Sequence, residues 1–268
     1  MKIKSIEDLQ PIINDIQHNL ALNGRQDFVE NYRGQSLNAY KLLNGFSRFN
    51  HKPNNLIIKE RKLLEKYVSQ VNNNKIDFIQ APYHQRRYAF INEWFFLYQA
   101  QHLGLKTRLM DWTMRWEIAL LFAVNEERHH GKDGQFWVFI CPREYIINSG
   151  NLGVIYNTHP LEIEGNFMIN SPFYQEVEGG DFIAERRRAR QHGRFFTQPF
   201  LKGLGAMDEQ HDLKQYLHKY IIDGNSKNRI KNELGNITSE WIYYRHDENI
   251  HTKIKFLNDL IINKCRIK

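Results

Sequence analysis

Residues 101–113, QHLGLKTRLMDWT, gather an unusual density of hydrogen-bonding side chains in one short stretch. They include a histidine, which can move a proton near neutral pH, an arginine, which can hold a phosphate, and an aspartate, which can stabilise a positive charge. An apolar run, EIALLFAV at 117–124, follows almost at once. Structural segments usually alternate polar and apolar residues regularly, whereas Gly104 and the clustered polar groups break that rhythm. The pattern is typical of one wall of a binding site.

A second candidate stretch, NYRGQS at 31–36, places an aromatic residue, an arginine and a glycine in succession. The guanidinium of Arg33 is a rigid, permanently charged fork that suits phosphate oxygens. Tyr32 offers a ring that can stack on a ligand, and Gly34 would let the backbone approach one closely. The stretch therefore indicates an anion-binding element.

Arginines are concentrated in a third stretch, ERRRARQHGR at 185–194, where they make up five of ten residues. Arginine forms bidentate contacts with phosphates, so this stretch is a candidate nucleic-acid contact. The alternative is a solvated helix face, since charge runs are common on surfaces. The residues predicted to contact nucleic acid are Arg186, Arg187, Arg188, Arg190 and Arg194.

The composition of the chain bounds what these stretches can belong to. Its 268 residues, 41% of them hydrophobic, can bury one large core, and the net charge of +7 with a pI near 9.2 favours polyanionic partners. That excess alone does not separate an RNA-binding protein from an ordinary basic enzyme. The longest apolar runs are far shorter than the roughly 20 residues of a membrane span, and the N-terminus lacks the apolar core of a signal peptide. We therefore expect a cytoplasmic protein without a membrane partner.

Several other classes of site find no support in the sequence. The two cysteines, Cys141 and Cys265, suggest neither a disulfide framework nor a cysteine metal site. His129 and His130 are adjacent and lack the spacing of a defined zinc site, so no metal is expected. The sequence also has no Walker loop, no dinucleotide-binding glycine fingerprint and no nucleophile elbow.

The elements that must position these residues follow from hydrophobic periodicity and turn signals. Gly104 would end one helix as a left-handed C-cap, 105–112 would be a connector, and Asp111 or Thr113 would cap the next helix. We expect helices over 5–20, 56–71, 88–102, 115–124, 226–234 and 250–263, and strands over 28–34, 136–141, 153–156, 194–201 and 219–223. The class is α+β, with residues 1–268 forming one domain and the helices at 5–20 and 250–263 as appendages.

The motifs together carry a resemblance to a known family. YRG at 32–34, QHLGLKTRLMDWT, ALLFA at 119–123 and ARQHGRFFTQ at 189–198 resemble the FRG domain family, named for its aromatic-Arg-Gly motif. The resemblance covers roughly residues 28–260. It departs from the family pattern at Met110, where leucine is usual.

The same motifs resemble elements of the ADP-ribosyltransferase fold. In many such enzymes a strand ends in aromatic-Arg-Gly, whose arginine grips the NAD phosphates. A later strand with a Ser-Thr-Ser or related motif leads into a helix, and a third element presents a catalytic glutamate. YRG resembles the first element, and DWT before EIALLFA resembles the second, in the same order. This resemblance implies a split mixed or antiparallel sheet core flanked by helices, with NAD as substrate and no metal.

The resemblance also implies a function and a set of site residues. The expected activity is NAD-dependent mono-ADP-ribosylation of RNA or DNA, in the setting of a toxin or antiphage effector with a possible antitoxin protein. The cofactor-binding residues would be Tyr32, Arg33, Gly34, Gln35, Thr107, Arg108 and Trp112. The catalytic residues would be Arg33, His102, Asp111, Thr113, Glu178 and Gln191. Among the last, Glu178, Asp111 and Gln191 are three open alternatives for the group that meets the ribose.

Other interpretations of these residues stay open from the sequence. The same cleft could bind a nucleotide or RNA without catalysis, or His102 could serve a nuclease. Arg33 could instead form a buried ion pair with Asp111 or Glu93, and Trp112 could belong to the core. Asp111 and Thr113 could be helix caps only, and the carboxylates near Glu178 could be solvated loop residues. A carboxylate converging on Arg33 would favour catalysis over binding.

Overall fold

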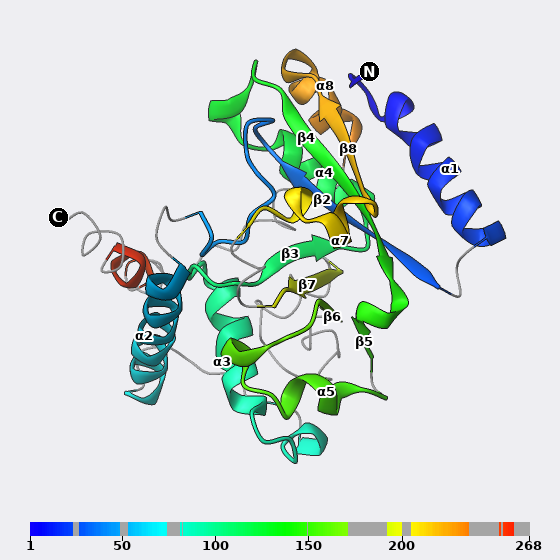
Figure 1. The fold of residues 1–268 in the computed structure, drawn as a ribbon. Coiled ribbons are helices and arrows are strands. Elements are labelled where there is room, and N and C mark those ends of the chain that lie inside the picture. Colours follow the sequence, from blue (N-terminus) through cyan, green and yellow to red (C-terminus); the bar gives the residue numbers. More distant parts are fainter. Residues whose placement is uncertain are drawn as a thin grey trace.

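The computed structural model describes residues 1–23, 27–48, 53–73, 81, 83–148, 150–170, 192–199, 205–235, 252 and 254–259. Within these residues a mixed sheet has the strand order β1-β8-β4-β2-β3-β7-β6-β5 (Figure 1). Its strands are β1 (Lys2–Ile3), β2 (Phe28–Gln35), β3 (Met110–Thr113), β4 (Gly134–Pro142), β5 (Ile146–Ile147), β6 (Phe167–Asn170), β7 (Gly193–Thr197) and β8 (Leu217–Ile222). Strands and helices alternate along the chain, which is compatible with the α+β class.

The sheet is held together weakly at its centre. β2 pairs with β4 along its whole length, from Phe28 opposite Pro142 to Gln35 opposite Gln135. On its other side β2 meets β3 at a single position, Tyr32 opposite Thr113. The strands β1, β8, β4 and β2 therefore form one half-sheet, and β3, β7, β6 and β5 form the other, with a gap beyond that one pair.

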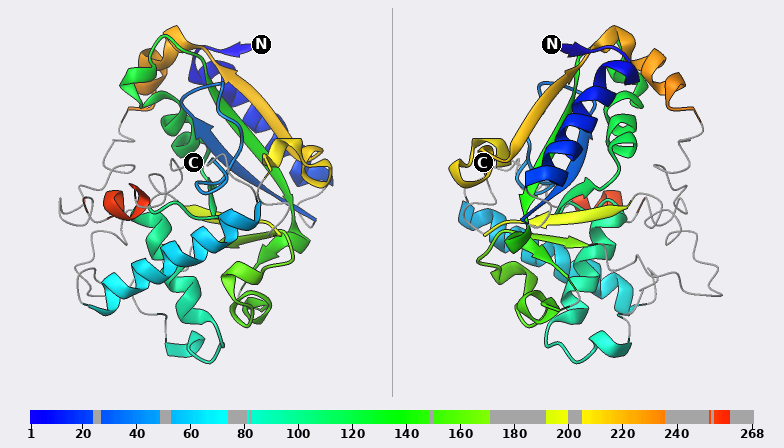
Figure 2. Two further views of the ribbon diagram at one scale, coloured as in Figure 1. Left: turned by 60° about the vertical axis from the view of Figure 1, so that its left-hand side comes forward. Right: turned by 90° about the vertical axis from the view of Figure 1, so that its right-hand side faces the viewer.

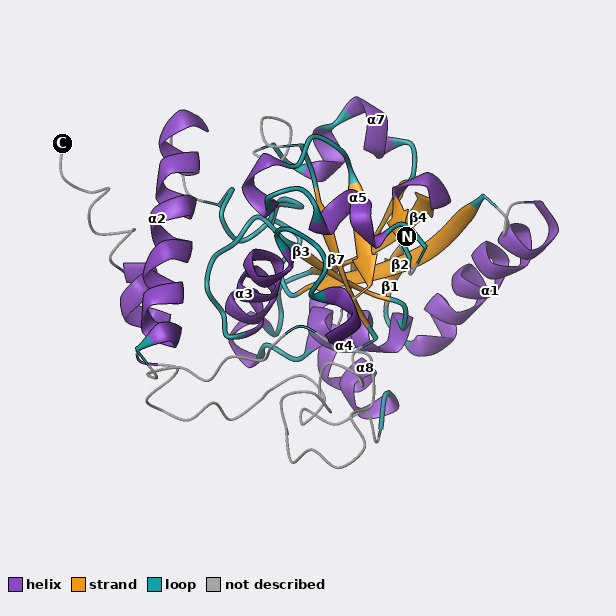
Figure 3. Ribbon diagram, turned by 90° about the horizontal axis from the view of Figure 1, so that it is seen from below, coloured by secondary structure: helices purple, strands orange, loops and turns teal. Residues whose placement is uncertain are grey.

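Helices cover the two half-sheets separately on one face (Figure 2). On the first half, α1 (Ile6–Asn23), α4 (Trp116–Val124) and α8 (Lys227–Glu233) enclose the apolar side chains of β2 and β4. On the second half, α3 (Ile91–His102) lies between α2 (Pro53–Asn72) and the sheet (Figure 3), with α5 (Leu152–Tyr156) beside it. The gap between the half-sheets thus lies where α3 and α4 approach each other.

The opposite face of the sheet carries one continuous apolar layer. Neighbouring strand residues point to opposite faces, so Phe195 joins the layer under α3 while Phe196 joins this one. Trp112, Trp137 and Phe139 also belong to it, and the short helix α7 (His211–Lys214) packs over it. The short 3-10 helices are Tyr83–Gln85, Glu127–His129, Arg143–Tyr145, Pro160–Glu162, Met207–Glu209 and Gly224–Ser226.

The predicted elements agree with the structure in most places. The helices expected over 5–20, 56–71, 88–102, 115–124 and 226–234 correspond to α1, α2, α3, α4 and α8, and the strands over 28–34, 136–141, 194–201 and 219–223 correspond to β2, β4, β7 and β8. Of the helix expected over 250–263, only 252 and 254–259 are described. No helix of the described part is both long and apolar enough to cross a membrane.

Two predicted elements were wrong. Residues 153–156 lie in α5 rather than in a strand, because Ile155 and Tyr156 pack together against α3 from one side of a short helix. The supposed connector 105–112 contains the start of β3, a short strand whose pairing with β7 is fixed by distant contacts that local pattern does not reveal.

Candidate functional site

A cavity of about 240 Å³ opens where the two half-sheets separate. Five elements contribute its walls: β2, β3, β7, α3 and α4. The lining residues are Tyr32, Arg33, Gly34, Gln101, His102, Asp111, Trp112, Thr113, Ile118, Ala119, Phe122, Gly193, Arg194 and Phe195. The structure thus brings the YRG stretch and the QHLGLKTRLMDWT stretch to opposite sides of one hollow.

Arg33 lies in the gap between the half-sheets. Its Nη1 donates a hydrogen bond to the backbone carbonyl oxygen of Asp111 on β3. Among the described residues it forms no ion pair with a carboxylate, so the buried ion pair with Asp111 or Glu93 considered from the sequence is not formed there. Burial lowers the pKa of the guanidinium to about 10, with the charge of Asp111 opposing the shift and that of Arg48 adding to it. Arg33 therefore keeps its positive charge at neutral pH.

The Asp111 carboxylate is held by a side chain that the sequence analysis did not single out. Gln101 Nε2 donates to Asp111 Oδ2 at 2.7 Å, and Gln101 Oε1 accepts from the Thr107 hydroxyl at 2.6 Å. Thr107 does not line the cavity; it fixes the orientation of the Gln101 amide, which does. The signal available in the sequence was the position of Gln101 at the head of the dense polar stretch.

The end of α3 places Gln101 and His102 at the cavity. Gly104 has φ +94°, the left-handed conformation predicted for it. The amides of Gly104 and Leu105 donate to the carbonyls of Gln101 and Ala100, which closes the helix as a Schellman motif. The chain then turns into β3, so the last turn of α3 and the strand face the same hollow.

Gly34 has a packing role that differs from the predicted one. A Cβ atom built on it would lie 1.7 Å from the carbonyl oxygen of Ala119, in α4. The glycine therefore lets α4, rather than a ligand, approach the backbone of β2. This close packing is what brings Ile118, Ala119 and Phe122 to the cavity wall.

The predicted helix caps were also wrong. α4 begins at Trp116 with Arg115 as its N-cap residue, and Arg115 makes no side-chain capping bond. Asp111 and Thr113 lie in β3, two or more residues earlier. The Thr113 hydroxyl instead accepts a hydrogen bond from the Arg115 amide at 3.1 Å, which orients the turn from β3 into α4.

The aromatic side chains of the cavity differ in what they expose. Tyr32 and Trp112 are 0% and 2% exposed, and each ring packs against a phenylalanine of β4. The stacking role expected for them does not fit this burial. Phe122 on α4 is 40% exposed and lines the same cavity, so its ring is the one that a planar ligand group can reach.

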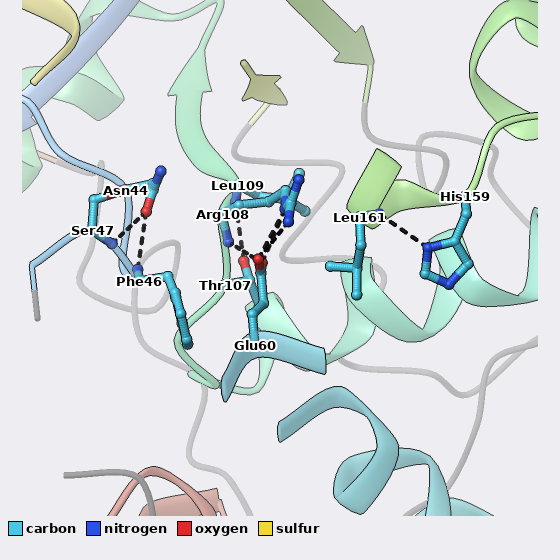
Figure 4. Close-up of polar contacts among 9 residues, drawn as sticks. All are labelled: Asn44, Phe46, Ser47, Glu60, Thr107, Arg108, Leu109, His159 and Leu161. Carbon is cyan, nitrogen blue, oxygen red and sulfur yellow. Dashed lines mark hydrogen bonds and ion pairs between the residues drawn. The ribbon is translucent and has the colours of Figure 1, made fainter. Parts of the chain in front are cut away.

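Arg108 and Gln35, both predicted to bind the cofactor, are engaged elsewhere. Arg108 forms a buried ion pair with Glu60 of α2, with Nη2 2.7 Å from Oε2 and both side chains less than a tenth exposed (Figure 4). The backbone amide of Arg108 donates to Glu60 as well. Gln35 accepts from Gln135 Nε2 at 2.7 Å. These residues fix the frame around the site, and they do not line the cavity.

Arg194 lies in β7 and is 8% exposed. Its Nη1 donates to Asn31 and its Nε to Asn170, each at 2.8 Å, so the side chain is held in the cavity wall instead of extending as an exposed polyanion contact. The other predicted nucleic-acid contacts, Arg186, Arg187, Arg188 and Arg190, lie outside the described residues, as do Glu178 and Gln191.

Further positive charge lies close to Arg33. The exposed Arg48 acts electrostatically on both Arg33 and Lys106, and burial is the larger cause of the lowered pKa of Lys106. The loop that carries Arg48 is fixed by Asn44 Oδ1, which accepts from the amides of Phe46 and Ser47 (Figure 4). The Phe46 amide also donates to the Thr107 carbonyl. This side of the site is electropositive.

Comparison with known proteins gives one family. Residues 30–132 match the model of the FRG domain, which spans β2, α2, α3, β3 and α4. No curated protein and no solved structure matches the chain.

Proposed function

We propose that the protein is an NAD-dependent ADP-ribosyltransferase that modifies a nucleic acid. The match to the FRG domain covers most of the elements that build the cavity. The observation that carries the proposal is that Arg33, which forms no carboxylate ion pair among the described residues, lines the same cavity as Asp111, whose carboxylate Gln101 orients. The split of the sheet at the Tyr32–Thr113 pair agrees with the divided core of that fold.

In this proposal Arg33 binds the phosphates of NAD. A buried guanidinium without a carboxylate partner attracts an anion more strongly than an exposed one, because less water screens it. The cavity of about 240 Å³ lies below the roughly 300–1,000 Å³ of sites that enclose a whole drug-sized ligand. It therefore suits one half of a dinucleotide, with Arg33 at the pyrophosphate and Phe122 against the nicotinamide ring.

Asp111 supplies the negative charge that the reaction needs. The bond between ribose C1′ and the nicotinamide nitrogen breaks, the ring leaves with the bonding electrons, and positive charge develops on the ribose. A carboxylate that is oriented in advance stabilises that charge. Gln101 provides the orientation by its hydrogen bond to Asp111 Oδ2. A nucleophilic oxygen or nitrogen of the acceptor then bonds to C1′, and His102, which lines the cavity, would take its proton.

The net charge of +7 and the arginines at 186, 187, 188 and 190 support a nucleic acid as the acceptor. An enzyme that modifies nucleic acids harms its own cell unless it is controlled. A toxin or antiphage effector with a protein antitoxin is the setting that fits such an activity, by analogy alone.

The test is transfer of label from NAD labelled in its adenylate phosphate to RNA, DNA or protein in a cell lysate. Arg33→Met and Asp111→Asn should abolish transfer, and Arg128→Gln, whose exposed ion pair with Glu126 lies outside the cavity, should not. Label on protein alone would contradict the nucleic-acid acceptor. Binding of NAD without transfer to any polymer would instead identify a nucleotide-binding module.

A further inference from the structure

Aromatic and cationic side chains alternate in a row across the centre of the sheet. Arg33 lies opposite Trp137 of β4, and Trp112 lies opposite Arg194 of β7. The Tyr32–Thr113 pair sets the register between β2 and β3, so the next position along places Arg33 across the gap from Trp112. Arg33 and Trp112 therefore face the same side of the sheet where the strands separate, and both line the cavity.

Trp112 lines the cavity, but its ring is packed into the apolar layer of the sheet. Its side chain is 2% exposed and belongs to the apolar layer with Met110 and Met168. The ring centroid lies 5.4 Å from that of Phe139 at a tilt of 48°. A ring packed in this way is not free to stack on a ligand.

The indole nitrogen of Trp112 has no hydrogen-bond acceptor among the described residues, although it is buried. The other deeply buried tryptophans of the described part are satisfied: Trp94 Nε1 donates to the carbonyls of Ile155 and Thr158, and Trp137 Nε1 donates to Gln135 Oε1 at 3.1 Å. Because an unpaired buried donor costs free energy, buried tryptophan N–H groups usually have a partner. Trp112 is the exception, and it is the one that lines the cavity.

Arg33 Nε is a second buried donor without an acceptor among the described residues. Both groups can only donate, so the ligand atom that would satisfy them must be an acceptor. An anionic oxygen is the strongest such acceptor and also compensates the guanidinium charge.

We propose that the indole N–H of Trp112 and the Nε–H of Arg33 form a two-donor subsite that binds one anionic oxygen group of the ligand. The subsite deepens the proposed function and rests on it for the identity of the anion, a phosphate of the nucleotide. Trp112 is then a residue that selects phosphorylated ligands through its N–H, and its ring serves only the core.

The experiment compares Trp112→Phe with Trp137→Phe, using ADP-ribose as the probe and adenosine as its phosphate-free counterpart. Both variants remove an indole N–H from the same apolar layer. We expect Trp112→Phe to keep a Tm near that of the wild type and to bind ADP-ribose at least about tenfold more weakly. Trp137→Phe should lower the Tm, because it leaves Gln135 Oε1 unpaired, and should change ADP-ribose affinity by less than about twofold. Adenosine affinity should not depend on Trp112.

A direct readout on the wild type accompanies the variants. The indole ¹H–¹⁵N resonance of Trp112 should move downfield when ADP-ribose is added, while that of Trp137 stays in place. Equal ADP-ribose affinity in the wild type and Trp112→Phe, an unmoved Trp112 resonance at saturation, or no ADP-ribose binding by the wild type would overturn the subsite. Trp112-dependent binding of ADP-ribose without any turnover of NAD would support the subsite and contradict the transferase.

Discussion

The side chain of Arg33 is hydrogen-bonded to the backbone of Asp111. The guanidinium of Arg33 donates to the carbonyl oxygen of Asp111, and the carboxylate of Asp111 accepts from Gln101. The two charged groups are therefore neighbours that interact electrostatically but form no direct ion pair. In the proposed reaction, the guanidinium of Arg33 would bind an anion and the carboxylate of Asp111 would stabilise a cation in the same cavity.

Replacing Arg33 should remove activity without reducing stability. Arg33→Met removes a buried charge that has no carboxylate partner, and it removes one hydrogen bond to Asp111. The variant no longer has to bury a charge, and this gain offsets the loss of the hydrogen bond. We therefore expect a free energy of unfolding that is higher than that of the wild type or lower by no more than about 1 kcal/mol. Denaturant unfolding measures this. A loss of more than about 3 kcal/mol would mean that Arg33 serves the core.

Two glycines of the cavity should respond in opposite ways to a methyl group. Gly34→Ala places a Cβ atom against the Ala119 carbonyl and should cost at least about 3 kcal/mol of stability. Gly193→Ala meets nothing within 4 Å and should change stability by less than about 1 kcal/mol. Because Gly193 lines the cavity, its methyl group should nevertheless weaken NAD binding. Thermal unfolding and a binding titration on both variants check this pair.

The ion pair of Glu60 with Arg108 should be structural. Glu60→Leu leaves the buried guanidinium of Arg108 without its carboxylate and should cost about 3–5 kcal/mol. Lys41→Ala breaks an exposed pair with Glu209 and should leave stability close to that of the wild type. The folded fraction of the Glu60 variant should bind NAD as the wild type does, since neither partner lines the cavity. A selective loss of NAD affinity would show that Arg108 does contribute to the binding site.

Stability should fall in acid partly through His159. Its Nδ1 accepts a hydrogen bond from the Leu161 amide (Figure 4), and burial is the main cause of its lowered pKa. The unfolded chain therefore binds the proton more readily. This contribution is fully present above pH 6.5 and is lost as the pH falls from 6.5 through the folded pKa.

The measurement is the Tm between pH 7.5 and pH 5. His159→Asn retains an acceptor oxygen without titrating, so it should reduce the acid loss by a few degrees. His129 and His192 also have lowered pKa values and should account for part of the slope that remains. An unchanged slope in His159→Asn would contradict the assignment.

Much of the fold could be predicted because local pattern decides it. The apolar periodicity of α1, α2 and α3 and the left-handed Gly104 are properties of neighbouring residues. β3 was missed because its four residues become a strand only through pairing with β7.

The site residues, too, could be predicted from the sequence only where residue type and neighbouring residues were sufficient. The sequence could indicate that Arg33 and Asp111 belong to a site, because their residue types and the dense polar setting are visible. It could not show that Gln101 holds the Asp111 carboxylate, that Arg108 pairs with Glu60, or that Gly34 is required by α4. Those facts depend on which segments meet in space.

Release of nicotinamide from NAD by the purified protein, with and without added RNA or DNA, tests the central claim most directly. We expect release by the wild type, stimulated by the acceptor polymer, and a decrease of at least about 100-fold in the folded Arg33→Met and Asp111→Asn variants. Equal release by the wild type and both variants would contradict the assignment of the cavity. No release by the wild type with any acceptor would contradict the transferase itself.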